Sequence, residues 1–234
     1  MDSRCAIHCN PHLAHQVRWA EAFREGFHRH GQACEITADA NQAADVHVVL
    51  GPHYALSQWR HHPRCIWLDR AFWGDPECAT IGWSTGDGRR FPLGETQRPH
   101  PDLHDWRIGR NAIVLADYGD DGSSMVAMAR PHFDTVTVRR HPVQGGSGTL
   151  SEALEGYQVA IGRKTSALIE AGILGLSVVC LDQDHPVMPI ATRSVRDIAR
   201  PDRREWIHQL SWANWSVGEI ATGEVWECLT TRCN

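Results

Sequence analysis

Short apolar runs alternate with amphipathic segments along most of the chain. The β-branched and apolar runs predict strands over residues 5–9, 46–51, 64–69, 111–119, 135–142, 157–162 and 176–182. Most are apolar on both faces, which is typical of strands covered by helices. Helical spacing predicts helices between them, over residues 12–31, 121–133 and 165–175. This alternation predicts an α/β fold with parallel sheets and crossover helices.

One long segment has no apolar period. Residues 84–111 are rich in Gly, Pro, Arg and Asp, and a connection of this length is unusual inside one domain. We therefore expect an N-terminal α/β half over residues 1–108 and a second α/β half over residues 109–200. A helical tail over residues 201–234 is expected to pack across both halves. Open α/β sheets bind ligands beyond the carboxyl ends of their strands, so we expect a cleft between the two halves.

The tail carries four of the chain's 10 tryptophans. Its pattern predicts two helical pieces, and the expected role of the large side chains is packing. The tail tryptophans are Trp206, Trp212, Trp215 and Trp226.

Composition narrows the class of protein. The chain has 234 residues, of which 42% are hydrophobic and 22% are charged, which is ordinary for a soluble globular protein. Its formal charge of -5 argues against nucleic-acid binding through overall charge. Lys164 is the only lysine among 23 basic residues, and clustered arginines favour bidentate contacts to phosphate. With no apolar leader and no run of transmembrane length, a cytoplasmic protein without a membrane partner is expected.

Eight cysteines are scattered along the chain without any CxxC pair. We expect reduced thiols, with Cys65 and Cys180 buried in strands. Cys5, His8 and Cys9 lie close together, but no second ligand pair follows at a zinc-like spacing. No metal site is therefore expected.

The segment "GRKTSALIEAGILGLSVV" places a polar cluster between a predicted strand and a predicted helix. Arg163, Lys164, Thr165 and Ser166 form the turn, where backbone N–H groups and the positive end of the helix dipole favour a phosphate. Glu170 lies one helical turn further on the same face, where its carboxylate can accept ribose hydroxyls. In the alternative interpretation, Thr165 caps the helix and Glu170 is solvated. The segment is not a P-loop, because it lacks the G-x-x-x-x-G-K-[ST] spacing.

A second polar cluster, "VRRHPVQGGSG", follows the preceding strand. Arg139, Arg140 and His141 lie at the strand's end, and the glycines after them can bring N–H groups close to an anion. The alternative is an exposed loop with solvated arginines. We expect both clusters to face one site, with His185, which follows the next strand, near the base or sugar.

These two clusters resemble a known enzyme family. "RRHP", a strand and then "TSALIEAGILGLSVV" resemble the nucleotide-sugar half of GT-B-fold glycosyltransferases, which commonly shows hydroxyl-x-x-x-Glu-Ala-x-x-x-Gly-x-x-Val. The tail "LSWANWSVGEIATGEVW" resembles the C-terminal helices of small bacteriophage glycosyltransferases. The resemblance covers about residues 109–228. The signature positions are Ser166, Glu170, Ala171, Gly175 and Val178.

The resemblance implies two Rossmann-like parallel-sheet halves that face a central cleft. It implies a nucleotide-diphosphate sugar such as a UDP-sugar as donor, with no tightly bound cofactor and no metal. Thr165 and Ser166 would hold the diphosphate and Glu170 the ribose. Arg139 or Arg140, with His141, would neutralise the leaving nucleoside diphosphate. The acceptor would be a hydroxyl, such as that of a hydroxymethylated base in phage DNA, in the host cytoplasm.

Glycosyl transfer also needs a base that deprotonates the acceptor. Asp69 leaves the third predicted strand at its carboxyl end, with Arg70 and Trp73 beside it and Asp75 as the alternate base. In the alternative interpretation Asp69 stabilises a turn and Trp73 anchors the loop in the core. The other expected substrate contacts are His8, Asn10 and His53.

Two other functions stay open. The short N-terminal half favours a catalytically silent nucleotide-binding module that has lost the acceptor chemistry. A nucleotide-sugar epimerase or hydrolase on the same fold would consume the donor without an acceptor. A dinucleotide oxidoreductase is not expected, because no G-x-G-x-x-G follows the first strand.

Overall fold

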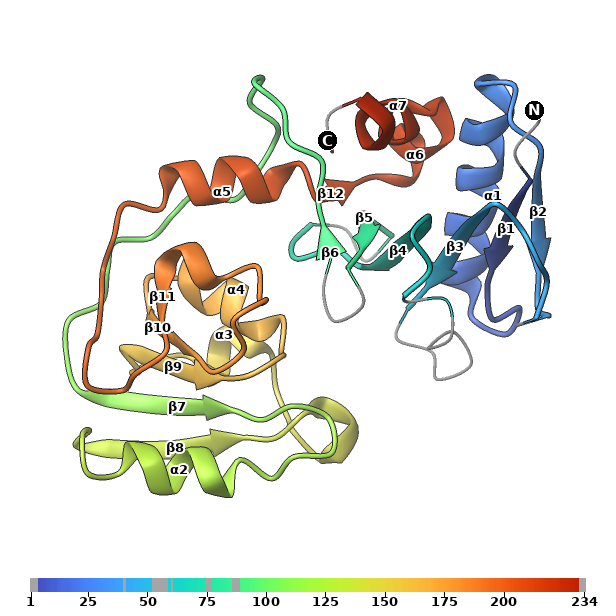
Figure 1. Ribbon diagram of the computed structural model, residues 1–234. Coiled ribbons are helices and arrows are strands. Elements are labelled where there is room, and N and C mark those ends of the chain that lie inside the picture. The colour runs from blue at the N-terminus through green and yellow to red at the C-terminus, as the bar shows by residue number, and fades with distance from the viewer. Residues whose placement is uncertain are drawn as a thin grey trace. The chain divides into compact units, whose positions relative to one another are not determined.

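A computed structural model describes residues 4–39, 41–51, 59, 61–74, 77–85 and 89–231. The chain is of the α/β class and divides into two compact units, each built around one sheet (Figure 1). Unit 1 comprises Met1–Pro99 and His208–Asn234, and unit 2 comprises His100–Ile207.

Unit 2 begins earlier than the sequence boundary near residue 108. The backbone N–H groups of His104 and Arg107 donate to the carbonyls of Ile173 and Gly175, at 3.0 and 2.7 Å. The guanidinium of Arg203 lies over the ring of Trp106 and donates to the carbonyl of His104. The end of the long irregular segment is therefore part of unit 2.

The sheet of unit 1 is mixed rather than parallel. Its order is β12-β5-β4-β3-β1-β2, with β6 also pairing with β5. The first four strands are parallel, but β5 runs antiparallel to β4, and β6 and β12 run antiparallel to β5. The strands are β1 (Cys5–His8), β2 (Cys34–Thr37), β3 (Val46–Leu50), β4 (Cys65–Arg70), β5 (Ala79–Ser84), β6 (Arg89–Arg90) and β12 (Asn214–Trp215).

The expectation of a parallel sheet in this half is wrong at β5, for a simple geometric reason. A parallel neighbour needs a crossover connection of a dozen or more residues, and only residues 71–78 separate β4 from β5. This short connection returns the chain antiparallel to β4.

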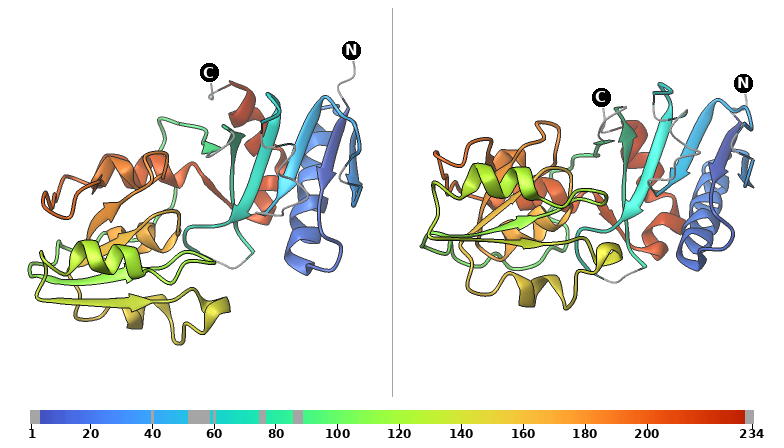
Figure 2. Two further views of the ribbon diagram at one scale, coloured as in Figure 1. Left: turned by 60° about the horizontal axis from the view of Figure 1, so that its bottom comes forward. Right: turned by 90° about the horizontal axis from the view of Figure 1, so that it is seen from below.

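The helices of unit 1 pack on one face of its sheet (Figures 1 and 2). They are α1 (Ala14–Arg29), α6 (Val217–Thr222) and α7 (Glu224–Thr231). The predicted apolar stripe of α1 is confirmed, since Phe23 and Phe27 are buried against the strands. The opposite face carries His8 and His47, both buried.

The sheet of unit 2 is parallel and Rossmann-like. Its order is β11-β10-β9-β7-β8, and every described pairing in it is parallel. Four of its strands were predicted from the sequence, and each is shorter than its predicted range. The strands are β7 (Asn111–Leu115), β8 (Thr135–Arg139), β9 (Val159–Gly162), β10 (Ser177–Cys180) and β11 (Ala191–Thr192).

Helices cover both faces of the unit 2 sheet. Met125 of α2 packs with Val179 on one face, whereas Gly172 of α4 lies against Val178, which points to the other. The helices are α2 (Ser123–Ala129), α3 (Leu150–Ala153), α4 (Ala167–Ile173) and α5 (Arg204–Ser211), with short 3-10 turns at Pro142–Gln144 and Met188–Ile190. Over the described residues, no helix has the length and apolar character needed to cross a bilayer.

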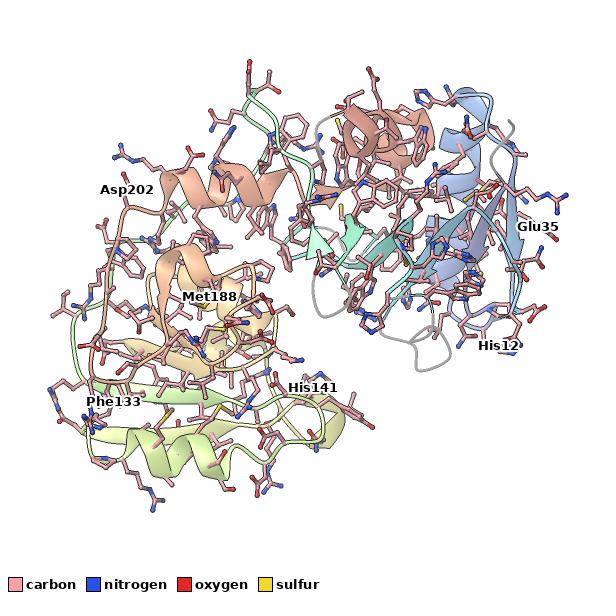
Figure 3. All side chains as sticks on the ribbon, viewed as in Figure 1. His12, Glu35, Phe133, His141, Met188 and Asp202 are labelled. Atoms are coloured by element: carbon pink, nitrogen blue, oxygen red, sulfur yellow. The ribbon has the colours of Figure 1, made fainter. Side chains whose placement is uncertain are left out.

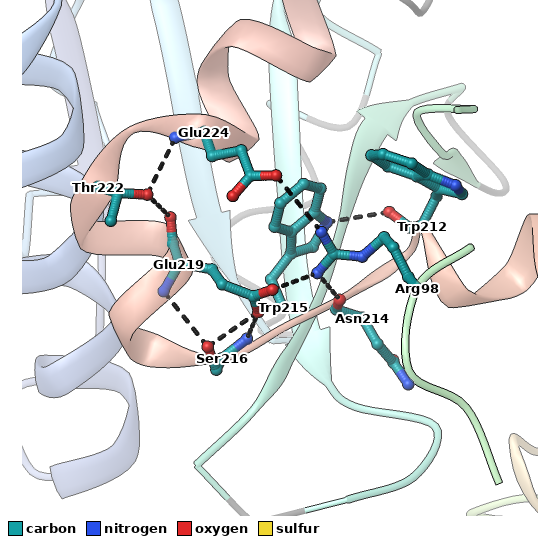
Figure 4. A network of polar contacts seen from close by, with 8 residues as sticks. All are labelled: Arg98, Trp212, Asn214, Trp215, Ser216, Glu219, Thr222 and Glu224. Carbon is teal, nitrogen blue, oxygen red and sulfur yellow. Dashed lines mark hydrogen bonds and ion pairs between the residues drawn. The ribbon is translucent and has the colours of Figure 1, made fainter. Parts of the chain in front are cut away.

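The tail contains three helices and a short strand instead of two helices, and from His208 onward it belongs to unit 1. Arg98 joins the irregular segment to it (Figure 4). Its buried guanidinium lies 3.9 Å from the centre of the Trp215 ring and donates to Glu219 at 2.7 Å. A second bond, of 3.1 Å, goes to the carbonyl of Asn214. This contact fixes the first part of the segment to unit 1.

Candidate functional site

The carboxyl edge of the unit 2 sheet contains a topological switch point. From β7 the chain moves to β8 on one side, whereas β9 pairs with β7 on the other side. Loops diverge at such a point, and open α/β sheets bind ligands there. The sequence-predicted donor-site residues lie at or beyond the carboxyl ends of β8, β9 and β10: Arg139, Arg140, His141, Lys164, Thr165, Ser166, Glu170 and His185.

Asp117, which sequence reasoning missed, lies at the centre of this edge. The backbone N–H of Lys164 donates to both oxygens of the Asp117 carboxylate, at 3.2 and 3.1 Å. Burial raises the pKa of the Asp117 carboxyl, and hydrogen bonds from the backbone of Lys164 and Thr165 oppose the rise. The sequence prediction extended the strand to residue 119, but β7 ends at Leu115. An acid just beyond a strand end is the pattern that would have found Asp117.

The anion bound by the β9–α4 turn is therefore the carboxylate of Asp117. The hydroxyl of Thr165 accepts from the N–H of Ala167 at 3.3 Å, but the N-cap of α4 is Ser166 rather than Thr165. Ser166 is exposed at the start of α4 and makes no side-chain cap. Because backbone groups of the turn are already used, a bound phosphate would depend mainly on side chains.

His185 supports this turn from inside the protein. Its side chain is 8% exposed, and its Nδ1 accepts from the N–H of Val187 at 3.1 Å. The other ring nitrogen, Nε2, is therefore the one that donates to the carbonyl of Thr165, at 3.2 Å. His185 positions the turn. On the exposed side, the Lys164 ammonium lies 3.8 Å from the carboxylate of Asp182.

Glu170 and Arg139 bring the two predicted clusters together. Glu170 is half-buried on α4, and burial raises the pKa of its carboxyl. The positive charge of Arg139 partly offsets that rise in pKa, so the two side chains lie within electrostatic reach. Arg139 donates to the carbonyl of Gly148 at 3.1 Å, while its buried Nε makes no hydrogen bond within the described residues.

His141 lies in the loop that follows β8 (Figure 3). Its Nδ1 accepts from the N–H of Val143 at 3.3 Å, and its ring meets the edge of the Tyr118 ring with centres 5.7 Å apart. Tyr118 is 72% exposed. An aromatic surface therefore lies beside the exposed Arg140 at this edge.

The glycine-rich loop is folded onto itself. The N–H groups of Gly145 and Gly146 donate to the carbonyls of Pro142 and His141, at 3.2 and 3.3 Å. A side chain at Gly146 would collide with the carbonyl oxygen of Arg140, so the close approach requires glycine. These two N–H groups are satisfied within the loop and do not face an anion.

In unit 1, Asp69 interacts electrostatically with a half-buried arginine. It is the fifth residue of β4, and its Oδ1 accepts from the N–H of Arg70 at 2.8 Å. Burial lowers the pKa of Arg89 and the negative charge of Asp69 opposes this fall, while the Arg89 guanidinium lies 5.3 Å from the centre of the Trp67 ring. Arg70 is exposed, and Trp73 is half-buried.

The other predicted substrate contacts of unit 1 have structural partners. His8 is 2% exposed, and its Nε2 lies 3.0 Å from Nδ1 of His47. Asn10 accepts from the N–H of His12 at 3.0 Å, and its own N–H donates to Gln16 at 2.9 Å, so Asn10 shapes the turn before α1. His53 and the alternate base Asp75 lie outside the described residues.

Comparison with known proteins assigns no family to the chain. No protein-family model matches it, and no curated protein matches it at a significant level. In the described part of the chain, no three His, Cys, Asp or Glu side chains are grouped so that they could hold a metal ion.

Proposed function

We propose that the chain is a glycosyltransferase whose unit 2 binds a nucleotide-diphosphate sugar at the carboxyl edge of its sheet. The electrostatic interaction of Glu170 with Arg139 carries this proposal. These residues come from two clusters separated in sequence, both are half-buried, and the charge of Arg139 lowers the pKa that burial raises at Glu170, beside a switch point of the sheet. A carboxylate suits ribose hydroxyls, and a guanidinium suits phosphate oxygens.

The residues take the following roles in this proposal. Glu170 accepts the ribose hydroxyls, and Arg139, Arg140 and Lys164 compensate the charge of the diphosphate. Charge compensation at the leaving group is what glycosyl transfer requires, because a nucleoside diphosphate leaves as an anion. Ser166, exposed at the start of α4, adds a hydroxyl donor.

Asp117 changes how the phosphate is held. Its carboxylate takes the N–H of Lys164, so backbone contacts contribute less to phosphate binding than the sequence motif implied. Side chains supply most of the phosphate contacts instead, and Asp117 with His185 keeps the turn in place.

In this proposal, residues of unit 1 activate the acceptor hydroxyl. Glycosyl transfer needs a base, and in this proposal Asp69 removes the proton from the acceptor hydroxyl while Arg70 and Trp73 contact the substrate. The resemblance of the tail to small bacteriophage enzymes supports a hydroxymethylated DNA base as acceptor.

A nucleotide-binding module without catalysis is the second candidate. One observation favours it: the negative charge of Asp69 favours the charged form of the half-buried Arg89, and Asp69 accepts a backbone hydrogen bond from Arg70. Both interactions are structural, so the presence of this carboxylate needs no catalytic explanation.

A turnover assay separates these candidates. The full chain is incubated with nucleotide sugars and DNA that carries hydroxymethylated bases, and the nucleosides are analysed by mass spectrometry. A glycosyltransferase adds a sugar to the base, and Asp69→Asn lowers turnover at least about 100-fold, the size expected for loss of a general base. Asp45→Asn, at an exposed acid of the same unit, is the matched control.

Three other outcomes count against the proposal in different ways. Donor binding without transfer in the wild type supports the silent module. Consumption of the donor without acceptor supports an epimerase or hydrolase. If Asp69→Asn still transfers the sugar, the protein is a glycosyltransferase but Asp69 is not its general base.

A further inference from the structure

Two cysteines face each other across the first two strands of unit 1. The parallel ladder between β1 and β2 places Cys5 directly opposite Cys34. Both side chains contact the same hydrophobic core, so they leave the ladder on the same face. Neighbouring strands lie about 4.8 Å apart, which is inside the range of about 4.4–6.8 Å between the Cα atoms of disulfide-bonded cysteines.

The two thiols differ in how easily a reagent reaches them. Cys5 is 5% exposed, whereas Cys34 is half-buried on β2, the edge strand of the sheet. A hydrogen bond with the Cys34 thiol and burial both raise the pKa of the Cys5 thiol. Cys34 is the accessible member of the pair and Cys5 the sheltered one.

The other strand-borne cysteines lack such a neighbour in their ladders. Cys65 lies opposite His47, and Cys180 lies opposite Gly162. Among the cysteines in the described strands, Cys5 and Cys34 are the pair that the register brings together.

We propose that Cys5 and Cys34 form a reversible oxidation site for a low-molecular-weight disulfide such as oxidised glutathione. The thiolate of Cys34 attacks one sulfur of the small disulfide, which breaks its S–S bond and releases one small thiol. Cys5 then loses its proton to solvent and attacks the Cys34 sulfur, which forms the Cys5–Cys34 bond and releases the second small thiol. Two electrons pass from the cysteines to the small disulfide.

The strand geometry explains why this bond would be reversible. A disulfide requires Cβ atoms about 3.5–4.5 Å apart, closer than the spacing of neighbouring strands, so β2 must move towards β1. An edge strand can make this movement, but the bond keeps some strain, and strained disulfides are reduced more easily. The bond would fasten β2 to the sheet and close the loop that contains α1.

Peptide mapping of the full chain tests this site. The reduced protein is exposed to oxidised glutathione, free thiols are alkylated, and the digest is analysed by mass spectrometry. The expected product is a cross-linked pair of peptides containing Cys5 and Cys34, with both alkylation sites lost and both restored by dithiothreitol. Cys34→Ser abolishes the cross-link, whereas Cys9→Ser, at a half-buried cysteine close to Cys5, preserves it.

The wild-type map alone is decisive if a variant fails to fold. Recovery of Cys5 and Cys34 as alkylated thiols after exposure to excess oxidant would overturn the proposal. So would an oxidation that stops at a mixed disulfide on Cys34, or a cross-link from Cys34 to a different cysteine. Nucleotide binding plays no part in this test, so its outcome is independent of the proposed function.

Discussion

The carboxylate of Asp117 accepts the backbone N–H of Lys164, 47 residues further along the chain. The bond joins the loop after β7 to the turn between β9 and α4, across the switch point of the sheet. Both segments line the proposed donor site, so the bond would set the shape of that site.

Removing this carboxylate should loosen the turn. We predict that Asp117→Ala lowers the free energy of unfolding by about 1 kcal/mol, as loss of a helix-capping acceptor does. Asp117→Asn keeps an acceptor oxygen and should cost less. Thermal unfolding of both variants measures the difference, and equal losses would show that the hydrogen bond to Lys164 is not what Asp117 contributes.

Asp117 should also affect how stability depends on pH. Its folded-state pKa is raised by burial, so the native state holds a proton more tightly than the unfolded state. Its contribution to stability is therefore present at low pH and is lost as the pH rises from the unfolded pKa through the folded pKa. Asp117→Asn should remove this loss, so its stability relative to wild type should rise with pH over that window. If the difference in unfolding free energy between Asp117→Asn and wild type does not change with pH over this window, the Asp117 carboxyl is not buried as described.

The paired histidines of unit 1 should make it sensitive to acid. Burial first, and then the charges of His8 and His62, lower the pKa of His47 to about 4. The unfolded state therefore takes up a proton first, and stability falls as the pH drops from about 6.5, the unperturbed value, towards 4. Chemical denaturation at several pH values should show a shallower fall in His47→Gln than in wild type. His61→Gln, at an exposed histidine, serves as the control.

Arg98 should be worth more to stability than a surface arginine. Its guanidinium stacks on Trp215 and pairs with Glu219, and the side chain is 9% exposed (Figure 4). We predict that Arg98→Ala lowers the free energy of unfolding by about 2–3 kcal/mol, from the lost cation–π contact and the unpaired groups left behind. Arg90→Ala, at an exposed arginine of the same unit, should change it by less than about 0.5 kcal/mol. Similar losses in both variants would contradict a special role for Arg98.

The elements that could be predicted are those whose residues carry a strong local pattern. The strands of unit 2 are apolar runs, and α1 has a clear apolar stripe, so their type follows from periodicity. The strand β2 was not predicted from the sequence. It lies at the edge of the sheet, and its sequence, CEIT, has few apolar residues. The strand β5 was not predicted either. Its antiparallel pairing with β4 depends on the length of the connection between them rather than on side-chain pattern.

The candidate site was predictable only in part, for a similar reason. Strand ends and helix faces predict which residues gather at an edge, and Arg139 and Glu170 were proposed on this basis. Contacts between distant segments have no local pattern. Asp117 with the backbone of Lys164 and His8 with His47 are such pairs, and these groups meet only because the sheets fold.

Nucleotide binding by the full chain tests the central claim most directly. Thermal shift and calorimetry are carried out with a panel of nucleoside diphosphates and their sugars. The proteins are wild type, Glu170→Ala, and Glu155→Ala as a matched control at an exposed glutamate of the same unit. A ligand at about 100 times its dissociation constant adds about 2.7 kcal/mol to stability.

We predict that one nucleotide stabilises the wild type and Glu155→Ala equally, and that its affinity falls at least about tenfold in Glu170→Ala, a loss of about 1.4 kcal/mol. If Glu170→Ala binds the nucleotide as tightly as wild type does, Glu170 does not contact the ribose. A wild-type protein that binds no nucleoside diphosphate and no nucleotide sugar would contradict the proposed donor site.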